Sequence, residues 1–118
     1  MRILLFVTVV VLHSSFPAYG EPLIRTVALE GGIAPGTGGS LFGGFSLPLI
    51  NDRAHVAFFG TTTGSNDVWS EGGGALHRVA AVGDAAPDSG GFNFASFENL
   101  NFNDLDQTAF VAMLAGAP

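Results

Sequence analysis

The chain of 118 residues contains no cysteine. This absence excludes disulfide bonds, and it excludes attachment to a membrane through a lipidated cysteine. Small secreted domains often use disulfides to compensate for a small hydrophobic core. If this chain is exported, its stability has to come from packing between parts of the chain.

Basic residues are also scarce. Lysine and arginine together number 4 against 10 acidic residues, and the formal net charge is −6. From Gly83 to the end there are five acidic residues and no basic one. A protein that binds nucleic acid needs a basic face to neutralise phosphates. The composition therefore excludes a nucleic-acid-binding role, whereas it favours solubility and permits binding of divalent cations.

An apolar run long enough to cross a membrane is absent as well. The longest such run, Ile3–Leu12, has ten residues, about half of the ~20 that a spanning helix needs. Arg2 precedes this run, and residues 18–20 (AYG) place small residues at positions −3 and −1 of a cleavage site. We therefore expect residues 1–20 to be a helical signal peptide, cleaved between Gly20 and Glu21, rather than a membrane anchor.

The mature chain is then secreted, periplasmic or attached to the cell surface of a bacterium. No later segment of the sequence is apolar over a long enough stretch to predict a transmembrane helix.

What the chain does contain is a duplication with a period of 52 residues. Between Val27 and Gly60, 13 of 34 positions are identical to the residue 52 positions later, without a gap. The identical residues are of two kinds, namely turn-forming glycines with an Ala-Pro pair and phenylalanines that suit a buried face. A fixed period near 50 residues is typical of a propeller, a solenoid or another repeat array.

The strand pattern predicts an all-β, antiparallel fold. We expect a first unit at residues 21–74 and an incomplete second unit at residues 75–118, with about four strands per unit joined by short turns. Both faces of Thr108–Ala115 are apolar, which favours sheets packed on both sides, as in propeller blades or, alternatively, a β-sandwich. The expected strands are 23–29, 45–50, 55–63, 67–70, 75–82, 96–102 and 107–114.

The second copy of the duplication carries a family likeness. It has Asn103, Ala109-Phe110, Ala112, Leu114 and Gly116 at the places of the pattern Asn-x-x-Gly-x-x-Ala-Phe-x-Ala-x-Leu-x-Gly, and only Asp106 departs, at the first Gly. The sequence thereby resembles the secreted bacterial choice-of-anchor tandem-repeat proteins. The resemblance implies a β-propeller-like repeat array, secreted or surface-attached, with no assigned activity.

Members of that family carry several repeats and a C-terminal sorting segment, and neither is seen here. The first copy also departs from the pattern, for example with Ala54 in place of the first Gly. The partner of Trp69 in the second copy would be residue 121. We therefore expect a partial or truncated member, or a chain that completes its sheet through self-association or further repeats.

One cluster of side chains suits a metal ion. Asn101, Asn103, Asp104 and Asp106 bring oxygen atoms together in one turn, and Ca²⁺ prefers oxygen ligands. The EF-hand pattern is absent, and the first copy offers only Asn51 and Asp52. We favour a turn stabilised by Asx hydrogen bonds, with a calcium site as the weaker alternative and no other cofactor.

The remaining candidates have simpler structural interpretations. Asp84 and Asp88 form a carboxylate pair of the kind used in glycoside hydrolysis, but the first copy has glycine at both places, which favours solvated loop residues. His55 and His77 lack the spacing of metal ligands and are interpreted as surface or edge residues. Trp69 is interpreted as a core residue rather than a platform for sugar stacking.

No set of residues predicts catalysis. We therefore expect an exported, non-catalytic structural or binding module of unknown ligand. The alternative is a fragment of a larger extracellular hydrolase or carbohydrate-active propeller. Hydrolase activity that is lost in Asp84→Asn or Asp104→Asn would favour the alternative.

Overall fold

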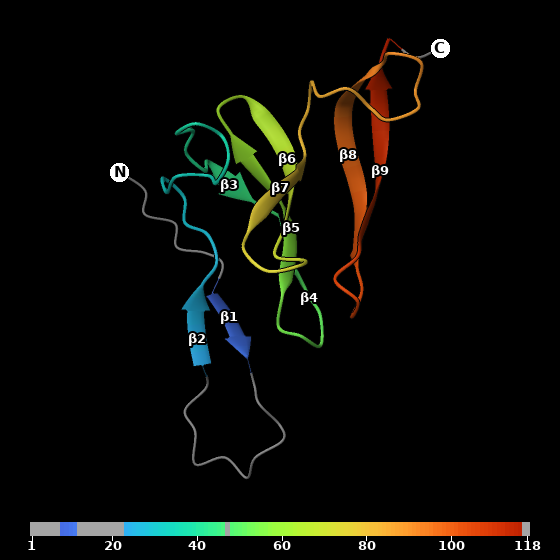
Figure 1. The fold of residues 1–118 in the computed structure, drawn as a ribbon. Coiled ribbons are helices and arrows are strands. Elements are labelled where there is room, and N and C mark those ends of the chain that lie inside the picture. Colours follow the sequence, from blue (N-terminus) through green and yellow to red (C-terminus); the bar gives the residue numbers. More distant parts are fainter. Residues whose placement is uncertain (1–7, 12–22, 47, 117–118) are drawn as a thin grey trace.

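The computed structural model describes residues 8–11, 23–46 and 48–116, and within these residues the fold is all-β and antiparallel, without a helix (Figure 1). The strands are β1 (Thr8–Val11), β2 (Leu23–Thr26), β3 (Gly44–Phe45), β4 (Leu49–Ile50), β5 (Val56–Thr62), β6 (Ser65–Ser70), β7 (His77–Ala80), β8 (Asn93–Phe102) and β9 (Thr108–Ala115).

The larger sheet is a meander in the order β3-β5-β6-β7, with β4 also paired to β5 on the same side as β3. β5 and β6 form a tight hairpin, because Gly64 adopts a positive φ of 75° in the connecting turn. Proline lacks the N–H that a sheet ladder needs. Pro48 therefore accounts for the interruption between β3 and β4, where the sequence predicts one continuous strand.

The smaller sheet consists of β8 and β9, and it lies against β4, β5 and β6 (Figure 1). Its register shifts twice, between Phe94 and Ser96 and between Glu98 and Asn101. β7 comes from the segment 75–118 but pairs with β6. The larger sheet therefore contains four strands of the first expected unit and one strand of the second.

The described residues form two hydrophobic clusters, of which the second connects the two sheets. The first contains Phe42, Phe58 and Trp69, and the second joins Val68 of the larger sheet to Phe97 of the smaller one. Trp69 is fully buried, which confirms its interpretation as a core residue, and its indole N–H donates to the main-chain oxygen of Gly60 at 3.2 Å.

The clusters contain matching groups of phenylalanines 52 positions apart. Phe42, Phe45 and Phe58 have ring centroids 5.2–6.2 Å apart. Their counterparts Phe94, Phe97 and Phe110 have centroids 5.1–6.2 Å apart. Such tilted and edge-on geometries are favourable for aromatic rings. The same packing arrangement therefore occurs at both copies of the sequence.

Main-chain hydrogen bonds recur with the same spacing. The N–H of Ala34 donates to the oxygen of Ser40 at 2.8 Å, and that of Ala86 to Phe92 at 2.9 Å. Gly31 donates to Phe42 at 2.7 Å, as Gly83 does to Phe94 at 2.8 Å. Both loops thus close with the same hydrogen bonds.

The sequence predicts a helical signal peptide at residues 1–20, but the described part of this segment is not a helix. Thr8–Val11 is the strand β1, paired antiparallel with β2. β-branched residues favour strands over helices, and this stretch has the sequence TVVV. The remaining residues of the expected signal peptide and its cleavage site lie outside the described residues. None of the described segments is a helix with the length and apolar character that a membrane crossing needs.

Candidate functional site

The first polar turn, residues 51–55, is closed by the side chain of Asn51. Its Oδ1 accepts hydrogen bonds from the main-chain N–H of Arg53 (3.0 Å) and of His55 (3.1 Å). The main-chain oxygen of Asn51 accepts from the N–H of Ala54 at 2.9 Å. Ala54 has a φ of 61°. Such Asx hydrogen bonding is typical of tight turns, and we call residues 51–55 the first asparagine turn.

The second asparagine turn, residues 103–107, repeats this geometry. Oδ1 of Asn103 accepts from the N–H of Leu105 (3.0 Å) and of Gln107 (2.9 Å). The main-chain oxygen of Asn103 accepts from Asp106 at 3.1 Å, and Asp106 has a φ of 63°. The Asx turn expected from the sequence is therefore present in both copies.

The two asparagine turns contact each other directly. Nδ2 of Asn51 donates to the main-chain oxygen of Asn103 at 2.9 Å and to Oδ1 of Asp106 at 2.7 Å. The main-chain N–H of Asp52 donates to Oδ1 of Asp104 at 2.8 Å. Asn51 thus uses one side-chain atom to close its own turn and the other to hold the next turn.

Asp106 is the acceptor at the centre of this contact. Its side chain is only 9% exposed. Oδ1 lies 2.8 Å from Nδ1 of His55, and Oδ2 lies 3.4 Å from Nη1 of Arg53 and accepts from the N–H of Gly73 at 3.3 Å. One carboxylate therefore connects the first turn, the second turn and the loop between β6 and β7.

This environment stabilises the charged form of Asp106. Burial by itself raises the pKa of a carboxyl group. Hydrogen bonds from His55, Asn51 and Gly73, together with the charge interaction with His55, outweigh burial and lower the pKa of Asp106 from 3.8 to about 2. Asp106 is consequently an anion at neutral pH.

The second turn also approaches the loop after β6 closely. A Cβ atom on Gly72 would lie 2.5 Å from the main-chain oxygen of Asp106, a distance that real Cβ contacts do not reach. Oγ of Thr108 and Oγ of Ser70 lie 3.3 Å apart beside this contact. Glycine at position 72 is therefore required by the packing of the two units.

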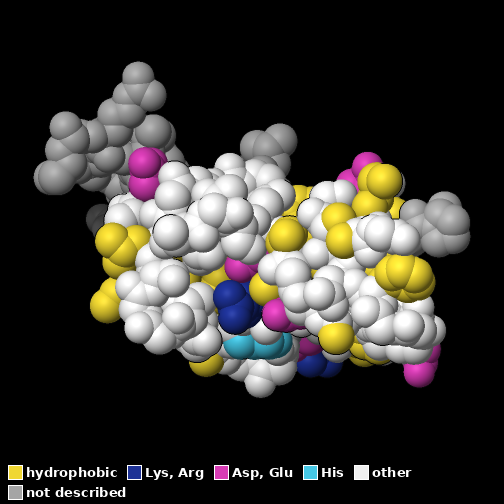
Figure 2. Space-filling view, turned by 90° about the horizontal axis from the view of Figure 1, so that it is seen from above, with side chains coloured by type: hydrophobic (Ala, Val, Ile, Leu, Met, Phe, Trp, Pro, Cys, Tyr) yellow, Lys and Arg dark blue, Asp and Glu magenta, His cyan; other side chains and the backbone are white. Residues whose placement is uncertain are grey.

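A second charged pair, Arg25 and Glu71, contacts the first turn at Ala54. Arg25 donates from Nη1 and Nη2 to the two carboxylate oxygens of Glu71, both at 2.7 Å, and Nη2 also donates to the main-chain oxygen of Ala54 at 2.7 Å. Oε1 of Glu71 accepts from the N–H of Val56 at 3.0 Å. Figure 2 shows basic, histidine and acidic side chains gathered near the middle of the face in view.

Asp67, which is fully buried, is the centre of a separate polar cluster at the β5–β6 hairpin. It accepts from the hydroxyl of Ser65 and from the N–H of Val82 at 3.1 Å, and Nη1 of Arg78 lies 3.5 Å away. Among the described residues, no buried side-chain nitrogen or oxygen atom lacks a hydrogen-bond partner. Asp67 therefore has a structural role in joining β6 to the segment that follows β7.

The four residues of the candidate calcium site make hydrogen bonds within the protein. The Asp104 and Asp106 carboxylates accept from the first turn, Asn103 closes its own turn, and Nδ2 of Asn101 donates to the oxygen of Asn99 at 3.3 Å. Nowhere in residues 8–11, 23–46 and 48–116 do three or more His, Asp or Glu side chains group closely enough to hold a metal ion.

The other candidates lie apart from this site, with one exception. Asp84 and Asp88 are exposed in the loop before β8, and His77 is exposed at the start of β7. The exception is His55, which precedes β5 and contacts Asp106. The sequence predicts only a surface or edge position for His55, because nothing in the pattern shows that residues 55 and 106 meet in space.

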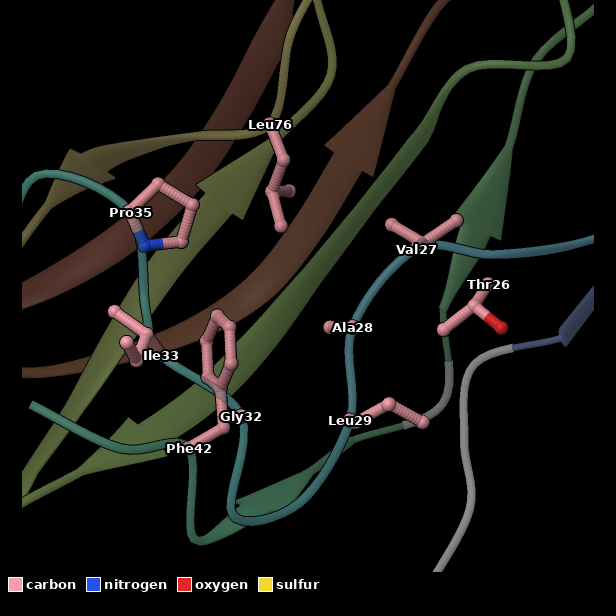
Figure 3. Close-up of a pocket in the computed structure, with 9 residues that line it drawn as sticks. All are labelled: Thr26, Val27, Ala28, Leu29, Gly32, Ile33, Pro35, Phe42 and Leu76. Atoms are coloured by element: carbon pink, nitrogen blue, oxygen red, sulfur yellow. The ribbon is translucent and has the colours of Figure 1, made fainter.

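An open apolar depression of about 270 Å³ is lined mainly by the segment that follows β2, together with Phe42 and Leu76 (Figure 3). Ile33 and Phe42 lie on one side of it in the close-up, and Val27 and Leu29 lie on the segment opposite. Its lining contains no ionisable side chain. The depression suits an apolar contact rather than chemistry.

Comparison with known proteins identifies a family without assigning an activity. No curated protein and no solved structure matches the chain. Residues 18–118 match a family described as "Family of unknown function (DUF7453)". Because this match covers more than half of the sequence, the chain belongs to the DUF7453 family.

Proposed function

We propose that this protein is an exported, non-catalytic structural or binding module, built from consecutive β units in a propeller-like array. The observation that carries the proposal is the contact between the asparagine turns, in which Nδ2 of Asn51 donates to Asn103 and to Asp106. The repeated Asn-Asp residues of the two turns thus make contacts between the two units. We infer that their role is to lock one unit against the next.

The strand order supports a blade-like unit. The larger sheet has five strands, and the last strand of its β3-β5-β6-β7 order, β7, comes from the second copy of the sequence. When the first strand of one unit completes the sheet of the unit before it, successive blades are linked. The glycine that the choice-of-anchor pattern has at positions 54 and 106 also suits the positive φ of both residues.

The proposal is tested by following the two sheets separately during unfolding. Trp69, the only tryptophan, reports on the larger sheet by fluorescence. Amide hydrogen exchange of β8 and β9 reports on the smaller one. If the turns lock the units, both probes give the same unfolding free energy, and Asn51→Asp lowers the protection of β8 and β9 more than it shifts the Trp69 transition. Independent unfolding of the two sheets in the unmodified protein would contradict the proposal.

Export is a separate part of the proposal and has its own test. Cleavage between Gly20 and Glu21 would remove β1, so that β2 would remain attached through the contacts of Arg25 with Glu71 and Ala54. Mass spectrometry of the protein recovered from outside the cytoplasm is expected to find Glu21 as the first residue. A protein that retains Met1 there would contradict it.

A further inference from the structure

The outer face of β9 leaves apolar side chains uncovered. Val111 is 47% exposed and Met113 is 60% exposed. Side chains alternate along a strand, so these two point away from the face on which Phe110 and Ala112 pack into the second cluster. On the side of the molecule where β8 and β9 lie, Figure 2 shows several hydrophobic side chains at the surface. Grouped apolar residues of this kind mark interaction surfaces.

The corresponding face 52 residues earlier shows what covers such a surface. Phe59 of β5 is the counterpart of Val111, and it packs against the cluster that contains Phe97 and Phe110 of the smaller sheet. Phe59 is thus covered by the next unit of the same chain, whereas Thr61, the counterpart of Met113, is exposed. The face of β9 has the same position in its own unit.

The second asparagine turn also carries a donor that is available for the same purpose. Nδ2 of Asn51 holds the following turn, whereas Nδ2 of Asn103 donates to Oε1 of Gln107 at 2.7 Å in an exposed position. If another turn approached, this bond would exchange for a contact like that of Asn51. The end of the molecule that carries β9 therefore has both the polar and the apolar features of the contact between the two units, which we call the joint.

The opposite end of the molecule offers the matching surface. The apolar depression is lined by Leu29 and Ile33, which are 42% and 70% exposed, and by Phe42, which is buried in the first cluster (Figure 3). Phe42 is the counterpart of Phe94, which packs against the larger sheet in the second cluster. In Figure 1 the segment that carries this depression and the strand β9 lie on opposite sides of the molecule.

We propose that a second copy of this chain docks its depression onto the outer face of β9, and so repeats between molecules the joint that links the two units within one molecule. This inference rests on the proposed function. A head-to-tail contact leaves one unused surface at each end, so association continues into short chains. The docking face is the outer face of one strand, β9, so we expect weak association that depends on protein concentration in the micromolar to millimolar range.

Multi-angle light scattering across that concentration range tests the proposal, with circular dichroism as a check of folding. Val111→Lys and Ile33→Lys each place a charge on one of the two surfaces, at side chains that are 47% and 70% exposed. Each variant alone is expected to remain monomeric. An equal mixture is expected to form dimers and nothing larger, because each variant retains the surface that the other has lost. Val79→Lys, at a 39% exposed residue of β7, is the control and should associate like the unmodified protein.

An unmodified protein that stays monomeric throughout, association that survives Val111→Lys, or a mixture that stays monomeric would each overturn head-to-tail docking. None of these results changes the unfolding of the two sheets within one molecule, so the proposed function would stand or fall separately.

Discussion

Nδ2 of Asn51 lies 2.7 Å from Oδ1 of Asp106, and this hydrogen bond between residues 55 positions apart in sequence joins the two asparagine turns. The same asparagine closes its own turn through Oδ1. Asn51 therefore links the local geometry of one unit to the position of the next.

Asn51→Asp should weaken the joint while it preserves the first turn. The new carboxylate keeps an oxygen that can accept from Arg53 and His55, but it loses the donor and places a negative charge beside Asp106. We expect the folding equilibrium constant to fall by about tenfold or more, because a hydrogen bond to a charged group is replaced by repulsion. Asn103→Asp is the matched control, since its Nδ2 contacts only Gln107 among the described residues. Equal losses in the two variants, measured by urea unfolding at pH 7, would contradict this role.

The stability of the protein should depend on the charge of Asp106 at low pH. The pKa of Asp106 is lowered to about 2 in the folded protein, below its value in an unfolded chain, about 3.9. Its contribution is therefore complete above about pH 4 and is lost as the pH falls towards 2. Asp106→Asn should be less stable than the unmodified protein at pH 7, and the difference should shrink between pH 4 and pH 2.

Asp88→Asn serves as the control for that titration. Asp88 is an exposed loop residue with a φ of 55°, which asparagine tolerates. A pH profile for Asp106→Asn that runs parallel to that of the unmodified protein from pH 7 to pH 2 would show that the Asp106 charge does not contribute.

Gly72→Ala should force the second turn away from the larger sheet. The added methyl group would meet the main-chain oxygen of Asp106 at 2.5 Å, and overpacking of this kind costs about 1–3 kcal/mol. Gly44→Ala is the control, because its nearest neighbour is Oγ1 of Thr61 at 3.5 Å, an ordinary contact. Thermal unfolding that is unchanged in Gly72→Ala would mean that the close approach is not needed for stability.

Ala54→Gly should stabilise the protein. Ala54 has a φ of 61°, a conformation that is unfavourable for alanine and free of strain for glycine. We expect a gain of about 0.5–1 kcal/mol. Ala57→Gly, in the buried strand β5 and without a positive φ, should instead destabilise the protein. A loss of stability in both variants would contradict the assignment of strain to position 54.

Features that depend on local sequence could be predicted. The antiparallel strands, the asparagine turns and the burial of Trp69 follow from alternation, Asx chemistry and composition. The break at Pro48 was not predicted, although proline cannot donate to a ladder. The expected helix in residues 1–20 was wrong for Thr8–Val11, where β-branched residues and pairing with β2 prevail.

Contacts between distant residues could not be predicted from one sequence. The duplication shows which residues are equivalent, but it does not show how two equivalent turns lie against each other. The interactions of His55 with Asp106 and of Arg25 with Glu71 join segments 51 and 46 residues apart. These pairs depend on the packing of the sheets, and neither sequence spacing nor charge pattern distinguishes them.

A double-mutant cycle between Asn51→Ala and Asp106→Gly tests the locking of the units most directly. Glycine removes the Asp106 side chain and suits its positive φ. We expect the two losses in the folding equilibrium constant to be non-additive by more than about threefold, as for residues in direct contact. The cycle of Asn51→Ala with Asp88→Gly should be additive. If Asn51→Ala and Asp106→Gly are additive within about twofold, the asparagine turns do not lock the two units together.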